Sequence, residues 1–261
     1  MRQLRLFRLF VRLGTMSEMA YRANFFIHAF ECAISLATGL SVLWVVYSRT
    51  PNINGWTWNE LMVVLGLYFL CFGLVSGIVG PSIKQFMVDV WDGTLDFMLI
   101  KPANHLFLAT TRKILIWHIV EIALGTTIVT VSLVRLGQQI GMAQALMFVI
   151  VLSAGAVLLY AFWIVLGTLA FWTTRLENVL IIFYNMYEAG RWPIGVYPGW
   201  LRTSLTFIVP VAFAVTMPAE AIIGRLSWAA VAGAVALAVP NFLLARWFFG
   251  VGLRHYTGAS A

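Results

Sequence analysis

Two pairs of polar side chains with identical spacing carry most of the chemistry that this sequence offers. His28 and Glu31 form one pair, and His118 and Glu121 form the other, each histidine standing three residues before its glutamate. On a helix, that spacing places both members of a pair on the same face. Histidine and glutamate can bind a metal ion, exchange protons or hydrogen-bond to each other. Which of these they do depends on the elements that hold them.

The sequence around the pairs is too apolar for a soluble protein. Of the 261 residues, 61% are hydrophobic and 10% are charged, whereas soluble domains carry roughly 25% charged residues. The same apolar content excludes a disordered chain. Two cysteines, Cys32 and Cys71, are too few for a disulfide framework or a thiolate metal site. The composition therefore predicts an all-α, polytopic membrane protein, with one transmembrane domain over residues 1–261.

Five stretches are long and apolar enough to cross a hydrocarbon core of about 30 Å. These predicted spans are Phe25–Ser48, Leu61–Ile83, Ile114–Val134, Met142–Thr174 and Leu226–Ala245. In the second of them, the Gly73-x-x-x-Gly77 spacing allows another helix to approach closely, and we expect it to serve packing within this chain. The two His–Glu pairs lie near one end of the first and third spans, so we expect them at similar depth.

Charged side chains inside a membrane are costly, so both pairs should face protein or water. We expect histidine and glutamate to satisfy each other near the cytoplasmic interface. A metal site built from the two pairs is an alternative that the sequence disfavours, and we assign no metal ligand. The functional hypothesis is a cytoplasmic vestibule that contacts a transported substrate through His28, Glu31, His118 and Glu121.

The stretch from Arg175 to Arg225 allows two interpretations. In the first, Leu176–Gly190 is a fifth span, and residues 191–225 form a re-entrant helical hairpin on the extracellular side, before the last span. The residues that mark this hairpin are Pro193, Pro198, Trp200, Pro210 and Pro218; proline kinks helices, and broken backbone survives at membrane depth only where protein or water satisfies it. In the second, Thr203–Gly224 is the fifth span, and Leu176–Leu201 is a loop.

Both interpretations give six spans with the two chain ends on one side. Basic residues are concentrated on the side of the amino terminus in either case, which predicts that the amino and carboxyl termini are cytoplasmic. Within residues 1–22, Arg2, Arg5, Arg8 and Arg12 fall on one helical face opposite an apolar face. We expect an amphipathic helix at the membrane interface rather than a nucleic-acid-binding segment. It either sets the topology or moves with the first span.

The cytoplasmic loop predicted at residues 84–113 should contain two short helices with a corner between them. Asp92 can cap a helix that starts at Gly93 or Thr94 and ends near Ile100, with Asp96 in its first turn, while Asn104 can cap the next helix. The first of these helices is expected to expose Leu95, Phe97, Met98 and Leu99. So much apolar surface in a cytoplasmic loop calls for a partner, unless it packs against the inner ends of this chain.

The stretch Gly93-Thr-Leu-Asp-Phe-Met-Leu-Ile-Lys-Pro102 resembles the coupling-helix region of ABC exporter permeases of the second type. The stretch from Arg191 to Leu201, continuing through Pro210, is similar to the segment after the fifth span in that family, which favours the re-entrant interpretation. The resemblance implies that the loop contacts an ATPase. The residues it assigns to this contact are Asp92, Gly93, Thr94, Leu95, Asp96, Phe97, Met98, Lys101 and Pro102.

The same resemblance implies a non-catalytic permease subunit in a bacterial-type plasma membrane. The sequence has no G-x-x-x-x-G-K-[ST] motif, so ATP and Mg²⁺ would bind a separate ATPase, present in two copies, and this chain itself would hold no cofactor. A second permease, identical or homologous, would complete the pathway for an amphipathic cargo such as a drug, lipid or natural product. An intramembrane enzyme and a secondary transporter are the alternatives. The expected partners are proteins and the bilayer, with no nucleic acid.

Overall fold

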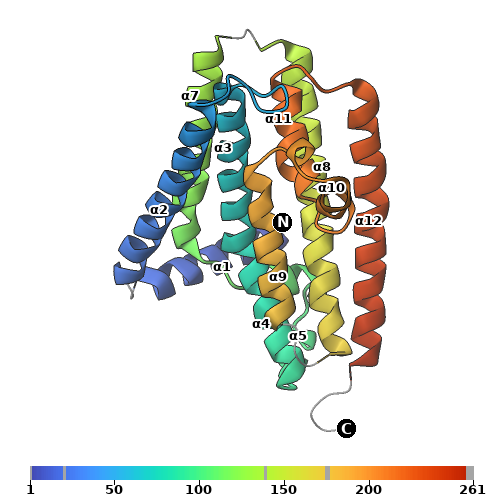
Figure 1. Ribbon diagram of the computed structural model, residues 1–261. Helices are drawn as coiled ribbons and strands as arrows, with labels where there is room; N and C mark the ends of the chain where they lie inside the picture. The colour runs from blue at the N-terminus through green and yellow to red at the C-terminus, as the bar shows by residue number, and fades with distance from the viewer. Residues whose placement is uncertain (1, 20–21, 138–139, 174–176, 257–261) are drawn as a thin grey trace.

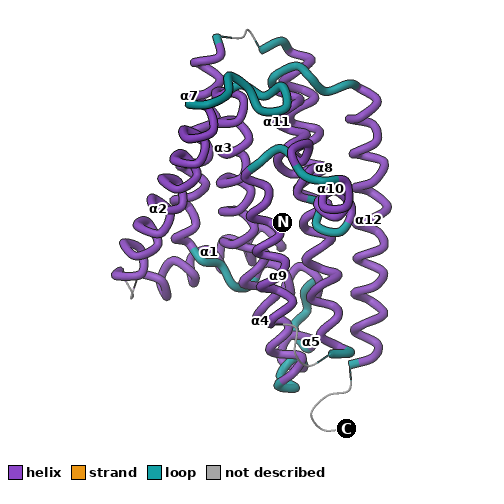
Figure 2. Tube along the Cα trace, viewed as in Figure 1, coloured by secondary structure: helices purple, strands orange, loops and turns teal. Residues whose placement is uncertain are grey.

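The computed structural model describes residues 2–19, 22–137, 140–173 and 177–256, and every regular element in these ranges is a helix (Figures 1 and 2). Five helices have the length and composition of a membrane span: Ala23–Tyr47, Trp58–Trp91, Ile116–Leu136, Met142–Phe171 and Trp228–His255. They are built from α2 (Arg22–Tyr47), α3 (Trp58–Leu74) with its continuation, α7 (Ile119–Leu136), α8 (Met142–Thr168) and α12 (Trp228–His255). The all-helical class and the five apolar spans predicted from the sequence are confirmed.

The second span is longer than the sequence predicts. After α3 the chain passes through the π-helical turn η1 (Val75–Val79) into α4 (Gly80–Trp91) without a break, giving 34 residues and a length of about 51 Å at 1.5 Å per residue. Pro81 has no N–H to donate to the carbonyl of Gly77, and that carbonyl instead accepts from Leu115 N at 2.8 Å. The predicted loop at residues 84–113 therefore begins as helix.

Glycines bring α3 and α7 into close contact. A Cβ on Gly66 would lie 2.9 Å from the Gly125 carbonyl oxygen, and one on Gly73 would lie 2.9 Å from the His118 carbonyl oxygen. Larger side chains at these positions would force the two helices apart. The predicted role of Gly73 and Gly77 in packing within the chain is confirmed, and this contact places His118 and Glu121 against the second span.

The chain from Glu177 to Ile222 is divided into short helices: α9 (Glu177–Glu188), η4 (Ala189–Arg191), η5 (Ile194–Val196), α10 (Gly199–Phe207), η6 (Ala212–Thr216) and α11 (Met217–Ile222). In Figure 1, α9 occupies the lower half of the bundle and α11 the upper half, with α10 between them. The α10 axis and the η6–α11 axis differ by 78°, as in a broken span or a re-entrant loop.

The loop of the second interpretation contains the helix α9. The bend between α10 and η6–α11 fits either a broken fifth span or a re-entrant loop. Both the span at Thr203–Gly224 and the re-entrant hairpin therefore stay predictions. The start of the predicted fifth span at Leu176 and the basic residue Arg175 lie outside the described residues, as do Met1 and residues 20–21 of the predicted amino-terminal arm.

Helix α1 (Arg2–Met19) crosses the lower part of the bundle instead of running along it (Figure 1). Phe10 packs against a cluster of buried residues at this end of the molecule, and Gly14 lies so close to the Ile114 carbonyl that a Cβ would be 2.6 Å from its oxygen. The predicted amino-terminal helix therefore exists and contacts the start of the third span. Its place at a membrane interface stays a prediction.

At the opposite end, two loops are joined by an ion pair. Glu60 in the first turn of α3 is 5% exposed, and its Oε1 accepts from Arg225 Nη2 at 2.6 Å. Its Oε2 accepts from the Thr57 backbone N–H at 2.8 Å and so caps the helix. The Arg225 guanidinium also lies over the Trp56 ring. The loop before α3 and the loop before α12 are thereby held together.

Candidate functional site

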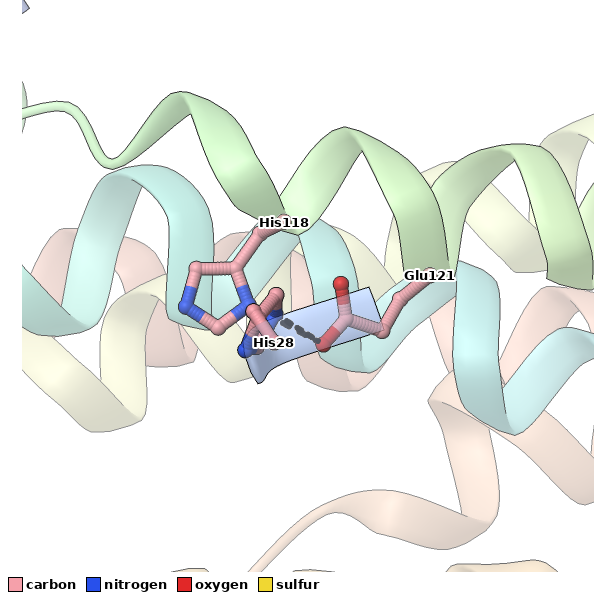
Figure 3. A group of neighbouring side chains, drawn as sticks. All are labelled: His28, His118 and Glu121. Atoms are coloured by element: carbon pink, nitrogen blue, oxygen red, sulfur yellow. Dashed lines mark hydrogen bonds and ion pairs between the residues drawn. The ribbon is translucent and has the colours of Figure 1, made fainter. Parts of the chain in front are cut away.

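Three of the four residues of the predicted vestibule converge at one point (Figure 3). His28 comes from α2, His118 from the short turn η2 (Ile116–His118), and Glu121 from the first turn of α7. Glu121 Oε1 lies 2.7 Å from His28 Nε2 and 3.2 Å from His118 Nδ1. The two imidazole rings meet edge to face with their centroids 4.5 Å apart. As expected for the second pair, His118 Nδ1 hydrogen-bonds to Glu121 Oε1, whereas His28 Nε2 has no hydrogen-bond partner among the described residues.

The carboxylate of this group is buried between helices. Glu121 is 3% exposed, because Gly73 and Gly77 let η2 and the start of α7 lie directly on the second span. A buried carboxylate needs partners that replace its hydration. Both histidines supply nitrogen atoms to Oε1, while Oε2 is buried and has no hydrogen-bond partner among the described residues.

Glu31 does not join this group. Its side chain is 67% exposed, and its Oε2 lies 3.6 Å from Nδ1 of His28, on the far side of the imidazole ring from Glu121. The first pair therefore has one member inside the cluster and one at its rim. We call His28, His118 and Glu121 the His–Glu cluster. Its residues are those that could hold a metal ion, since their ligand atoms all lie within 4.8 Å of one another.

Two cavities adjoin the cluster. One of about 240 Å³ is lined by Glu18, Asn24, Ile27, His28, Glu31, Leu115, Trp117 and His118. The other, of about 580 Å³, lies between the second span, α8 and α9, and is lined by Phe72, Ser76, Gly80, Pro81, Lys84, Lys113, Leu115, His118, Trp163, Leu180, Ile181 and Tyr184. His118 borders both. We call the larger one the α4–α9 pocket.

The α4–α9 pocket was not predicted. Its walls are mostly apolar and aromatic, and two exposed lysines, Lys84 and Lys113, lie at its edge without a carboxylate within 4 Å among the described residues. These residues come from four helices and a connecting segment that are distant in sequence. The one local signal was the pair of lysines at the ends of the predicted cytoplasmic loop, which the positive-inside bias alone explains.

The predicted coupling helix is shorter than expected and starts later. Helix α4 continues to Trp91 and Asp92 is its C-cap, followed by Gly93 in the left-handed region with φ +69°. The helix α5 (Asp96–Leu99) has Leu95 as its N-cap. The prediction that Asp92 caps a helix starting at Gly93 or Thr94 is wrong, because the Thr94 and Leu95 N–H groups bond back to the Asp89 carbonyl.

The apolar side chains of this segment divide between two faces. Leu95 and Met98 are 0% and 1% exposed, and they pack in a cluster with Phe86, Leu108, Ile164 and Phe249. The prediction that both are exposed is wrong, and Leu99 is only partly buried. Phe97 and Ile100, by contrast, are 70% and 78% exposed. We call Phe97 and Ile100 the exposed α5 face.

The rest of the loop is fixed to the second span. Arg112 forms an ion pair with Asp89 of α4; burial lowers the pKa of its guanidinium, which stays charged at neutral pH. The Asn104 side chain accepts from the Phe107 N–H at 3.2 Å and caps α6 (His105–Thr111), which confirms that prediction. The corner between α5 and α6 is formed by Lys101, Pro102 and Ala103. Burial also raises the pKa of Tyr256, which lies near Asp96.

The prolines predicted to mark the hairpin stand at helix boundaries. Pro193 and Pro198 are the N-caps of η5 and α10, and Pro218 lies in the first turn of α11. Pro210 lies in the bend between α10 and η6. Trp200, at the start of α10, is 73% exposed. Pro193, Pro198 and Pro210 agree with proline ending or starting helices, whereas Pro218 lies inside the continuous helix Ala212–Ile222, where η6 passes into α11.

One comparison with known proteins identifies the chain. The family model described as ABC-2 family transporter protein matches residues 33–260, a range that includes the second His–Glu pair, the predicted coupling helix and all described helices after α2. No curated protein and no solved structure gives a match.

Proposed function

Since the chain belongs to the ABC-2 transporter family, we propose that it is the transmembrane permease subunit of an ATP-driven exporter. Members of this family are multi-pass membrane proteins, and their permeases are generally non-catalytic and typically work with ABC ATPases. Two ATPase subunits bind ATP and Mg²⁺, and a second permease, identical or homologous, completes the pathway. The complex lies in a bacterial-type plasma membrane with both termini of this chain in the cytoplasm.

The exposed α5 face carries this proposal. Phe97 and Ile100 project from a segment whose other side, Leu95 and Met98, is buried in the same chain. Large apolar side chains that are free on one face of a well-anchored segment are typical of a docking surface. An ATPase that docks there binds a segment that is packed against the rest of the permease and therefore moves together with it.

Motion of the docked ATPase would pass from α5 into the second span. The turn at Gly93 connects α5 directly to α4, and the Asp89–Arg112 ion pair holds the following segment against the same helix. Because Trp58–Trp91 is one helix, a displacement at its lower end also moves the wall of the α4–α9 pocket. ATP binding then shifts the population between inward-open and outward-open states.

The α4–α9 pocket supports an amphipathic cargo. Its aromatic walls suit an apolar body. Lys84 and Lys113 at its edge, which have no carboxylate within 4 Å in the part of the chain that the structure describes, suit a polar or anionic group. In this arrangement His118 contacts the cargo, while Glu121 is buried behind it. The substrate vestibule inferred from the sequence consists of four residues, and one of them, His118, lines this pocket.

The exposed α5 face gives a direct test. We expect Phe97→Asp and Ile100→Asp to abolish stimulation of the ATPase that co-purifies with the chain, because a charge replaces apolar contact, while the permease itself remains folded. Phe97→Leu is the matched control and should retain stimulation. The measurements are ATPase activity in proteoliposomes and recovery of the ATPase with the tagged permease. Full stimulation by both aspartate variants, or the absence of any co-purifying ATPase, would contradict the proposal.

A further inference from the structure

We propose that the His–Glu cluster binds a divalent transition-metal ion, with His28 Nε2, His118 Nδ1 and Glu121 Oε1 as its ligands. The three atoms lie within 4.8 Å of one another. They come from α2, from the turn η2 that precedes α7, and from the first turn of α7. Two imidazole nitrogens and one carboxylate oxygen are the donor set of open Zn²⁺ sites with a fourth position for water. The same donors disfavour Mg²⁺ and Ca²⁺, which prefer oxygen ligands.

The Glu121–His118 distance fits an ion placed among the ligands, and the Glu121–His28 distance is shorter than a bound ion would set. Ligand atoms around tetrahedral Zn²⁺ lie roughly 3.3 Å apart, given bond lengths of about 2.0–2.1 Å. The observed separations from Glu121 Oε1 are 2.7 Å to His28 and 3.2 Å to His118. His28 Nε2 is near the carboxylate and yet has no hydrogen-bond partner among the described residues. A shared ion satisfies both atoms.

Glu31 has the position of an orienting residue for His28. Metal-bound histidines usually donate their second N–H to a carboxylate, which fixes the ring and its tautomer. Glu31 Oε2 lies 3.6 Å from Nδ1 of His28, just beyond hydrogen-bond distance and on the opposite side of the ring from Glu121, so a small shift of its side chain would let it accept from Nδ1. In the first pair His28 is a ligand and Glu31 lies behind its ring, whereas both members of the second pair are ligands.

Charge and access also favour a cation. Glu121 is buried with one carboxylate oxygen unpartnered among the described groups, and a buried negative charge gains from a bound cation. The 240 Å³ cavity beside the cluster has two further carboxylates, Glu18 and Glu31, in its wall. An ion can reach the histidines from this cavity without crossing an apolar barrier.

The ion would strengthen a weak contact. In the apolar window of α2 only 11% of the residues are buried, so α2 is held to the bundle by few side chains. A metal bonded to His28 on α2, to His118 in η2 and to Glu121 in the first turn of α7 joins the two spans near the end where α1 crosses the bundle. This role does not depend on the proposed transport function.

The test uses the full-length protein in detergent, purified with a tag that contains no histidines and stripped with a chelator. We expect the wild type to bind one Zn²⁺ per chain in competition with a chromophoric chelator, in the presence of millimolar Mg²⁺, and to unfold at a higher temperature with Zn²⁺ than without it. His118→Ala and Glu121→Gln should lose at least nine-tenths of this binding and the thermal shift. Glu31→Gln should weaken the affinity roughly 10- to 100-fold.

His255→Ala, which changes an exposed histidine at the end of α12, is the matched control and should bind as the wild type does. Wild-type protein that binds no Zn²⁺, or cluster variants that bind as much as His255→Ala, would overturn the proposal. If the variants aggregate, the absorption spectrum of Co²⁺ added to the wild type decides. A saturable d–d spectrum of a four- or five-coordinate ion supports the site, and a spectrum of aqueous Co²⁺ alone refutes it.

Discussion

At the scale of single residues, the most unusual feature is a carboxylate shared by two histidines within a membrane span. Glu121 Oε1 contacts both His28 and His118, so removing the carboxylate would leave two imidazoles without an acceptor. Glu31, with the same sequence context, is mostly exposed. The two H-x-x-E pairs are alike in sequence but differ in role, because η2 and α7 lie against the second span and the exposed face of α2 does not.

The two faces of α5 predict different outcomes for the same kind of substitution. Leu95→Asp places a carboxylate among Phe86, Met98 and Phe249, where nothing compensates its lost hydration. We expect this variant to lose about 3 kcal/mol or more of stability, seen as a lower unfolding temperature and aggregation on size-exclusion chromatography.

Phe97→Asp is the comparison for that experiment, since Phe97 is 70% exposed. It should elute as a single symmetrical peak and unfold at the wild-type temperature. Equal stability of Leu95→Asp and Phe97→Asp would contradict the buried position of Leu95.

At the scale of elements, the contact between α3 and α7 sets the position of the His–Glu cluster. A Cβ on Gly125 would lie 2.5 Å from both the Gly66 carbonyl oxygen and the Leu70 backbone nitrogen. Backbone atoms cannot move aside as a flexible side chain can, so the helices must separate. We expect Gly125→Ala to lower the unfolding temperature by several degrees, consistent with a loss of about 1–3 kcal/mol from overpacking.

Gly233→Ala is the matched control, because Gly233 is also in a span helix and its added Cβ would meet nothing within 4 Å. It should be neutral or slightly stabilising, as alanine is the better helix former. If Gly125→Ala were as stable as Gly233→Ala, the close contact between α3 and α7 would be wrong.

The sequence predicts the membrane spans, but not the contacts between them or the turns that connect the short helices. Apolar stretches of about twenty residues with at most one charged side chain identify membrane helices whatever their neighbours are, so five spans follow from the sequence. The meeting of His28 with Glu121 depends on how α2 leans on α7, which no local pattern encodes. The sequence predicts an exposed Leu95 because it predicts a helix that starts at Gly93 or Thr94. The left-handed turn there starts α5 later and turns Leu95 inward.

At the scale of the whole molecule, the two ends are organised differently. The lower end gathers α1, α5 and the end of α12 around one buried cluster (Figure 1), and this is the end that we propose meets the ATPase. The upper end is held by the Glu60–Arg225 ion pair and by the hydrogen bond from Asn54 Nδ2 to the Gly195 carbonyl at 2.8 Å.

Breaking the upper ion pair should destabilise the entire bundle. Arg225→Ala leaves the 5% exposed Glu60 without its cationic partner, and we expect a loss of about 1–2 kcal/mol, since Arg225 is partly exposed. The double variant Glu60→Gln/Arg225→Ala should be more stable than the sum of its single variants predicts. Unfolding temperatures of the four proteins measure this coupling, and strictly additive effects would show that the pair contributes nothing.

The Glu60–Arg225 pair also bears on how the protein is made. The partners are 165 positions apart, so a nascent chain contains Glu60 long before the ribosome has added Arg225. Until then the carboxylate keeps its cap at Thr57 but has no counter-ion from the last loop. A chain truncated before α12 therefore displays an open upper end. Membrane proteases that survey unfinished proteins are expected to remove such chains faster than full-length ones.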